Sequence, residues 1–317
     1  MGVHAWTIYA SGEIDADADK RLSALLVEKN IPGGSFVYLN SPGGSLLGGI
    51  KLGQTIRKHF LYTYIGQLNP GSLLHPNPGY CFSACALAFL GGEYRFWTKG
   101  SVYGVHRFFW KEHTNNDADI AQILSASVVQ YIRSMGIDTK LFALASEAGS
   151  SDAITPTPDE LLTLNVINNG QKPVQWSLES LPGMMYLKGQ QENWVNGVSK
   201  FMLTCPAKGP MFLYAIFNAG PNANEVMGWS TDWLFSDKSQ FQIQDMQLSR
   251  LNKNGEINIF FKVDDALLGI LARTRATVGI GLSPAPGAAI FEGFDYMPFA
   301  GGAAKLPGFL QVCGHRS

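Results

Sequence analysis

Three short stretches in the first third of the chain carry residue types that could act together on a carbonyl group. Ser83 stands where a loop enters an apolar, alanine-rich helix expected over 84–90. The free amides and positive end of such a helix would face a nucleophile whose reaction develops an oxyanion. His106 follows an apolar strand expected over 102–105, and ligands bind at strand ends in parallel sheets. The third stretch, Asn40-Ser41-Pro42-Gly43-Gly44, is a turn whose glycines leave amides exposed toward a ligand.

Each stretch also has a simpler interpretation. Ser83 could be an ordinary N-cap serine, the glycine turn an ordinary strand-to-helix connection, and His106 a structural residue at a strand end. The residues around Ser83 are not the Gly-x-Ser-x-Gly elbow of α/β-hydrolases. Taken together, the three stretches favour one site on one domain.

Alternating strands and helices must position these residues. Apolar runs predict strands over 5–10, 35–40, 61–66, 94–97 and 102–105, and helical spacing predicts helices over 15–30, 46–59, 84–90 and 117–135. This alternation, with nearly continuous apolar strands, indicates an α/β domain with a largely parallel sheet.

The pattern changes near residue 170. Beyond residue 171 the helical spacing is lost, and short apolar or alternating runs are separated by Gly, Asn, Asp and Pro; the stretch 252–255 (Asn-Lys-Asn-Gly) is a hairpin signal. The expected strands include 184–187, 200–203, 211–216, 240–243, 257–263 and 277–280. We therefore expect an α/β domain over 1–170 and an all-β, sandwich-like domain over 171–317.

Composition limits the function. The 317 residues include 24 Lys+Arg and 25 Asp+Glu, for a net charge of -1, which argues against a general nucleic-acid or polybasic membrane binder. The 46% of hydrophobic residues excludes a disordered chain. No run approaches the ~18 apolar residues of a membrane span, so no transmembrane segment is expected.

The three stretches resemble the ClpP-like serine peptidases of the ClpP/crotonase superfamily, over residues 5 to about 168. The turn at 40–44 matches the family's almost letter for letter, Ser83 falls at its nucleophile, and His106 follows at close to its interval. The segment at 83–92, Ser-Ala-Cys-Ala-Leu-Ala-Phe-Leu-Gly-Gly, is more similar to bacterial exported ClpP-like proteins than to the cytosolic subunit. The resemblance therefore implies a periplasmic or exported protein whose leader was trimmed; the abrupt start at Met1 also fits a cytoplasmic one.

The resemblance implies a serine endopeptidase that needs no metal or nucleotide cofactor and acts on peptides or proteins. His106 would remove the Ser83 proton, and Asp152 would fix the imidazole tautomer. The backbone amides of Gly44 and Ala84 would form the oxyanion hole. Two hypotheses compete: a non-catalytic binding or assembly protein on the same fold, and acyl-CoA chemistry, for which no basic cluster is visible.

Several parts of the pattern depart from the family or stay open. Asp159 is an alternative to Asp152 as the third residue of the catalytic triad. Ser151 or a water molecule could orient the histidine instead. The loop 69–79 looks longer than usual and could cover the site. The segments 117–135 and 141–145 are similar to the family's handle region, which implies a homo-oligomer. The appended second domain is foreign to the cytosolic subunit, so no unfoldase partner is expected.

The cysteines and one lysine allow further chemistry. Cys81 and Cys85 could be a nucleophile or a metal pair, but their spacing favours small buried helix residues. Cys205 and Cys313 each close an expected strand and could pair as a disulfide, which would support export. Lys99 could form a Ser-Lys dyad, but its Thr-Lys-Gly-Ser context favours a solvated turn.

Overall fold

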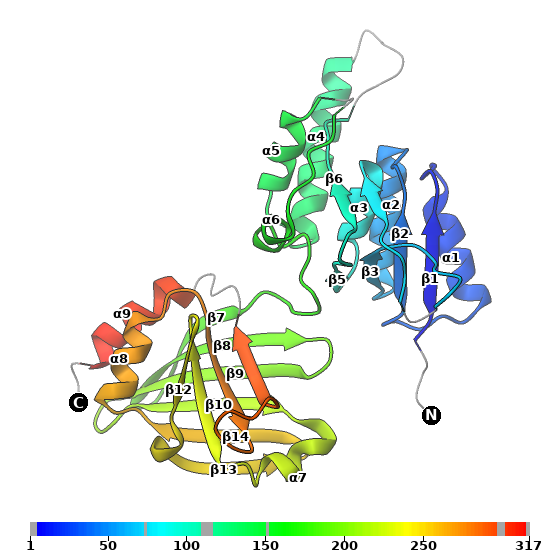
Figure 1. Cartoon of the computed structure of the whole chain (residues 1–317). Helices are drawn as coiled ribbons and strands as arrows, with labels where there is room; N and C mark the ends of the chain where they lie inside the picture. The colour runs from blue at the N-terminus through cyan, green and yellow to red at the C-terminus, as the bar shows by residue number, and fades with distance from the viewer. Residues whose placement is uncertain (1–4, 73–74, 109–116, 150–151, 297–301, 315–317) are drawn as a thin grey trace. The chain divides into compact units, whose positions relative to one another are not determined.

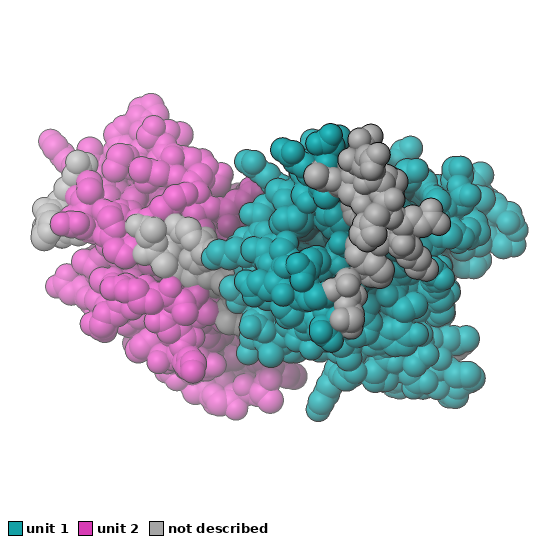
Figure 2. All heavy atoms as spheres, turned by 90° about the horizontal axis from the view of Figure 1, so that it is seen from above, with its two compact units in different colours: residues 1–170 teal, residues 171–317 magenta. Residues whose placement is uncertain are grey.

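The computed structural model describes residues 5–72, 75–108, 117–149, 152–296 and 302–314 (Figure 1). The chain divides into two compact units, Met1–Gly170 and Gln171–Ser317, coloured separately in Figure 2. Each unit has its own cluster of buried apolar side chains.

Unit 1 is built on a four-stranded parallel sheet. Its strands follow the order β1 (Thr7–Ser11), β2 (Phe36–Asn40), β3 (Tyr62–Ile65) and β5 (Arg95–Phe96). Val37, Leu39 and Ile65 are buried on one face, as expected for apolar residues that alternate along a strand. Aromatic rings stack across the strands on the other face. The expected parallel sheet is therefore confirmed.

Three helices accompany this sheet: α1 (Ala18–Glu28), α2 (Leu46–Lys58) and α3 (Ala84–Leu90). Every residue of α3 is buried. Helix α2 reaches α3 through a glycine, because a Cβ on Gly49 would lie 2.2 Å from the Ala84 carbonyl oxygen. This close backbone approach fixes the start of α3 against α2.

A second pair of parallel strands leads into α3. Strand β4 (Tyr80–Phe82) pairs with β6 (Val102–Gly104), and an isolated bridge joins Ser41 to Cys81. The remaining helices of the unit are α4 (Asp117–Ser134), α5 (Lys140–Glu147) and α6 (Pro158–Thr163). The expected strands and helices of unit 1 are confirmed to within three residues at each end.

Unit 2 holds two antiparallel sheets. One has six strands in the order β13-β14-β10-β9-β8-β7, and the other has four in the order β12-β11-β15-β16. Phe217 of β10 meets Phe294 of β16 edge to face, with ring centroids 6.3 Å apart, so the two sheets share a core. The strands are β7 (Gln175–Leu181), β8 (Met184–Asn193), β9 (Gly197–Pro206), β10 (Phe212–Asn218), β11 (Thr231–Ser236), β12 (Ser239–Gln242), β13 (Gln247–Lys253), β14 (Glu256–Lys262), β15 (Val278–Ser283) and β16 (Glu292–Tyr296).

The prediction of a β-rich second region is confirmed, but its all-β character is wrong. Unit 2 also contains α7 (Ala223–Val226), α8 (Asp265–Arg273) and α9 (Gly302–Gly314). Helix α8 buries Leu267 and Leu271, one turn apart, and the Asp264 side chain caps it by accepting from the Leu267 amide at 2.8 Å.

The segment ending at Cys313 was expected to be a strand and is helix α9 instead. Its buried residues recur at helical spacing, at Leu306, Leu310 and Cys313. The pairing that the sequence leaves open is present: a disulfide joins Cys313 to Cys205 of β9, with Cα atoms 5.6 Å apart. In the part of the chain that the structure describes, no helix has both the length and the apolar character to cross a bilayer.

Candidate active site

Ser83 occupies a strained backbone position at the junction of β4 and α3. Its φ is 58° and its ψ is -120°, a combination that non-glycine residues rarely adopt and that costs on the order of 1–3 kcal/mol. The Ser83 amide donates to the Gly104 carbonyl at 3.0 Å. Strain of this kind persists where the surroundings enforce it, and it concentrates at functional positions.

The glycine turn lies directly against Ser83. A Cβ on Gly43 would stand 2.7 Å from the Ser83 Cβ and 3.2 Å from the Ala84 nitrogen. Both Gly43 and Gly44 have positive φ, of 108° and 136°. Only glycine satisfies this combination of backbone conformation and close approach. Two of the three stretches singled out in the sequence are thus in contact.

Two amides beside Ser83 are free of protein acceptors. Gly44 lies in a bridge where the Ile14 amide donates to the Gly43 carbonyl and the Ser45 amide donates to Ile14, both at 2.7 Å. The Gly44 amide takes no part in those bonds. Ala84 is the first residue of α3, a position without an intrahelical acceptor. Within the described ranges, neither amide donates to the protein.

Ser83 and His106 line the same small cavity, of about 60 Å³. Both residues are half-buried, so each keeps access to the cavity. Its remaining walls are largely apolar and come mainly from α3, α4 and α5, with Leu87, Val128, Ile132, Leu141 and Phe142 among them. His106 therefore shares a cavity with Ser83, although no hydrogen bond joins the two side chains among the described residues.

The His106 ring has a hydrogen-bond partner in the backbone. Its Nδ1 lies 2.8 Å from the carbonyl oxygen of Arg107. A carbonyl oxygen only accepts, so this hydrogen bond forms in the tautomer that carries its proton on Nδ1. Sequence reasoning missed this partner, because a main-chain carbonyl has no signature in the residue types.

Asp152 and Asp159 differ in their relation to His106. Val105 and Ile154 form an antiparallel bridge, each amide donating to the other's carbonyl at 2.9 Å. The bridge places Ile154, two residues after Asp152, opposite Val105, the residue before His106, and Asp152 is exposed. Asp159 is exposed on α6, and neither aspartate lines the cavity. Ser151 lies outside the described residues.

The two cysteines around Ser83 are joined to each other. Cys81 and Cys85 form a disulfide with Cα atoms 5.1 Å apart, and neither has any exposed surface. Their interpretation as separate helix residues is therefore wrong: Cys81 belongs to β4, and the chain turns at Ser83 before α3 begins. Lys99 is exposed and does not line the cavity.

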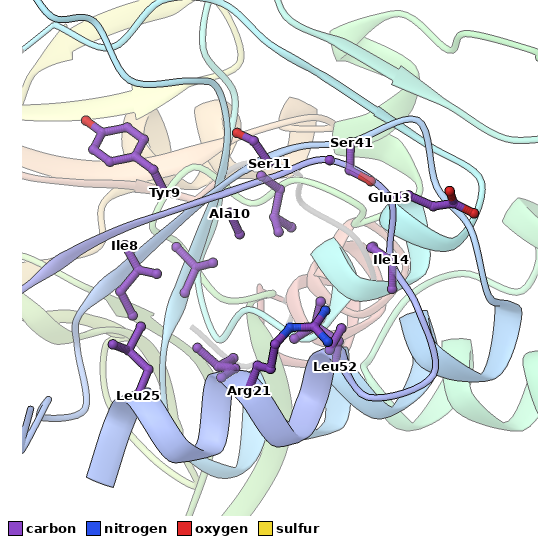
Figure 3. Close-up of a pocket in the computed structure, with 15 residues that line it drawn as sticks. Ile8, Tyr9, Ala10, Ser11, Glu13, Ile14, Arg21, Leu25, Ser41 and Leu52 are labelled. Atoms are coloured by element: carbon purple, nitrogen blue, oxygen red, sulfur yellow. The ribbon is translucent and has the colours of Figure 1, made fainter. Parts of the chain in front are cut away.

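Two other features lie apart from this cavity. The loop 69–79 is closed by paired hydrogen bonds between Gln67 and Asn77, and its described residues do not line the cavity. A larger hollow of about 290 Å³ opens between β1 and α1, where Figure 3 shows Arg21 among Ile8, Leu25 and Leu52. Neither Ser83 nor His106 lines that hollow, and Arg21 pairs with Asp15 at 2.9 Å. The candidate site is therefore the smaller cavity.

Comparison with known proteins gives structural likeness only. No protein-family model and no curated protein matches the sequence. A mutant of ClpP1 from Listeria monocytogenes is similar in structure, with a TM-score of 0.40 and 16% identity over 51% of this chain and 88% of that one. A mutant of the membrane-bound stomatin-specific protease 1510-N has a TM-score of 0.37 and 18% identity, over 51% of this chain and 77% of that one. The roles of Ser83 and His106 are argued below from the geometry of this chain alone.

Proposed function

We propose that this chain is a serine endopeptidase of the ClpP-like type, with Ser83 as nucleophile and His106 as general base. One observation carries the proposal. A strained serine at the head of a buried helix shares a cavity with a histidine whose Nδ1 is paired with a backbone carbonyl. Nucleophilic serines are activated by such a neighbouring base.

We propose the following reaction for these residues. His106 Nε2 takes the Ser83 hydroxyl proton as the serine Oγ bonds to the peptide carbonyl carbon. The resulting oxyanion accepts from the amides of Gly44 and Ala84, and each such donor lowers the barrier by roughly 3 kcal/mol. His106 then gives its proton to the amide nitrogen as the C–N bond breaks. Water, with His106 again as base, hydrolyses the acyl-enzyme and restores Ser83.

We retain Asp152 as the third member of the triad, in a reduced role. In this proposal, the Arg107 carbonyl holds the proton on His106 Nδ1. Asp152 is exposed, so water screens its attraction for the imidazolium that forms during attack. Its contribution to catalysis is smaller than that of a buried aspartate.

The walls of the cavity indicate the substrate. Helices α4 and α5 contribute Val128, Ile132, Leu141 and Phe142, which favour an apolar side chain beside the scissile bond. We propose peptides or proteins with such a residue as substrates, with no cofactor in the reaction. Unit 2 then serves in assembly or substrate binding.

We propose an exported protein that assembles as a homo-oligomer. Two disulfides, Cys81–Cys85 and Cys205–Cys313, support export, because such bonds persist in oxidising compartments such as the periplasm. Fractionation of native cells tests the compartment, and recovery of the protein in the cytoplasm overturns the proposed export.

Sedimentation velocity at micromolar concentration tests the assembly, and a monomer at that concentration contradicts the proposed homo-oligomer.

Hydrolysis of short peptides tests the function. Ser83→Ala and His106→Ala should each lower kcat at least 10³-fold, because residues of such a unit act together. The controls are Ser127→Ala and His59→Ala. Both replace half-buried residues outside the cavity, so both variants should retain full activity. The proposal is overturned if Ser83→Ala cleaves as fast as the wild type, or if the wild type cleaves no peptide with an apolar residue at the bond.

A further inference from the structure

The Cys81–Cys85 disulfide encloses the proposed nucleophile. Cys81 lies in β4, two residues before Ser83, and Cys85 lies in α3, two residues after it. The ring closed by the two sulfurs contains the residue with φ of 58° and also Ala84, whose amide is the proposed oxyanion donor. Both reacting parts of the site are thus inside one covalent loop.

Hydrogen bonds hold the two sides of this loop unequally. On the strand side, the Phe82 amide donates to Ser41 at 3.1 Å and the Ser83 amide to Gly104 at 3.0 Å. On the helix side, the Leu87 amide reaches the Ser83 carbonyl only at 3.4 Å, at the weak end of the range for such bonds. The Ser83 side chain makes no cap bond to the described residues of α3. The disulfide is therefore the one covalent cross-link, within the described residues, between the helix start and the strand.

Global stabilisation from this bond is smaller than from the second disulfide. The chain-entropy gain of a disulfide grows with the loop that it closes. Cys81 and Cys85 are separated by 4 positions, whereas Cys205 and Cys313 are separated by 108. Both sulfurs of the short loop are fully buried, which also shields them from exchange with dissolved thiols. The other effect that the Cys81–Cys85 disulfide can have is local, on the backbone geometry around Ser83.

We propose that Cys81 and Cys85 are positioning residues: their disulfide keeps Ser83 in its strained conformation, with the hydroxyl and the Ala84 amide aimed at one substrate carbonyl. This inference rests on the proposed peptidase function. Without the bond, Ser83 relaxes toward negative φ, where L-residues are unstrained. The apolar cavity that binds the substrate side chain is lined by α4 and α5 as well as by Ala86 and Leu87 of α3, and the walls from α4 and α5 stay in place.

The test compares two disulfides in the full-length chain. Cys81→Ala/Cys85→Ala should lower kcat on a short peptide at least tenfold, leave KM within about twofold, and slow fluorophosphonate labelling of Ser83 in proportion. The matched control, Cys205→Ala/Cys313→Ala, removes the other disulfide and should keep the wild-type kcat. If the first variant fails to fold, Cys81→Val/Cys85→Ala refills the space, with valine suited to a strand and alanine to a helix.

Four outcomes decide the proposal. A fall in kcat without a rise in KM, absent from the control, supports it. Wild-type kcat in the folded Cys81/Cys85 variant overturns it, and so does an equal loss in both variants. A tenfold rise in KM at unchanged kcat also overturns it, because it indicates damage to the binding cavity. Failure of the peptidase proposal itself is seen separately, as a wild-type chain that neither cleaves peptide nor labels at Ser83.

Discussion

His106 is held by its own neighbour in the chain. The Arg107 carbonyl, 2.8 Å from Nδ1, favours the tautomer protonated there, a task that a buried aspartate performs in the chymotrypsin-type triad. Asp152 is exposed, two residues before Ile154, which pairs with Val105. In the proposed mechanism, the backbone would therefore orient the base, and the carboxylate would act through solvent.

Replacement of the two aspartates measures this division of roles. Asp152→Asn should lower kcat/KM by about tenfold, far less than the ~10⁴-fold loss when a buried triad aspartate is replaced. Asp159→Asn, on the exposed side of α6, should leave kcat/KM unchanged. Steady-state kinetics on one peptide checks both. A loss above 10³-fold for Asp152→Asn contradicts the role given to the Arg107 carbonyl.

Residue types predicted one part of the site better than the other. Ser83 and His106 could be singled out because a helix start and a strand end are visible as changes in sequence pattern. The Cys81–Cys85 disulfide could not, since a spacing of four residues suggests one helical face. The sulfurs meet only because the chain reverses at Ser83, and a φ of 58° at a serine has no sequence signal.

At the scale of elements, prediction succeeded where the hydrophobic pattern is local. The strands of the parallel sheet and α2 were found because their apolar residues recur at periods of 2 and 3.6. Strand β4 has only three residues, Tyr80–Phe82, and its bridge to Ser41 spans 40 positions. Such a short strand is stabilised by the distant segments that pair with it and could not be predicted from its own residues.

In unit 2, a helix that the local sequence pattern indicates was not predicted. Helix α8 has both a cap at Asp264 and buried leucines one turn apart. In α9, Gly302, Pro307 and Gly308 lower helix propensity, and the helix is held by burial and by the disulfide to β9. Tertiary packing overrides local preference there.

The β7–β8 hairpin should respond to acid through Glu179. Hydrogen bonds from Lys188, Tyr186 and Ser177 lower the pKa of its carboxyl from the usual 4.5 to about 2. Because the folded-state pKa is below the unfolded value, the stabilisation is present above pH 4.5 and is lost as the pH falls toward 2.

Thermal unfolding of Glu179→Gln against the wild type checks this dependence. The difference in Tm should be largest near neutral pH and should shrink between pH 4.5 and 2, because glutamine does not titrate. The effect is modest, since the group is exposed to solvent. A Tm difference that stays constant over this range contradicts the role of the Glu179 charge.

At the scale of the whole molecule, the second disulfide should contribute strongly to the stability of unit 2. Cys205 and Cys313 close a loop with a separation of 108 residues, which in the chain-entropy model stabilises the fold by about 4.7 kcal/mol. Cys205→Ala/Cys313→Ala should lower the free energy of unfolding of unit 2 by about this amount. Guanidinium unfolding followed by hydrogen exchange resolves the two units, and a loss confined to unit 1 contradicts the assignment.

The structure of unit 1 also helps to explain the low content of charged residues. Only 15% of the residues are charged, and unit 1 buries α3 entirely while covering one sheet face with aromatic rings. Few exposed positions are left for charges on these elements. The near-neutral balance is consistent with the proposed recognition of substrate through an apolar cavity rather than through electrostatic attraction.

The central claim is that Ser83 is an activated nucleophile, and covalent labelling tests it most directly. Incubation with a fluorophosphonate, followed by intact and peptide mass spectrometry, should give one adduct per chain on Ser83. The adduct should be absent in Ser83→Ala and strongly slowed in His106→Ala, which lacks the base. An adduct on another residue, undiminished labelling of Ser83→Ala, or no labelling of the folded wild-type protein would contradict the account.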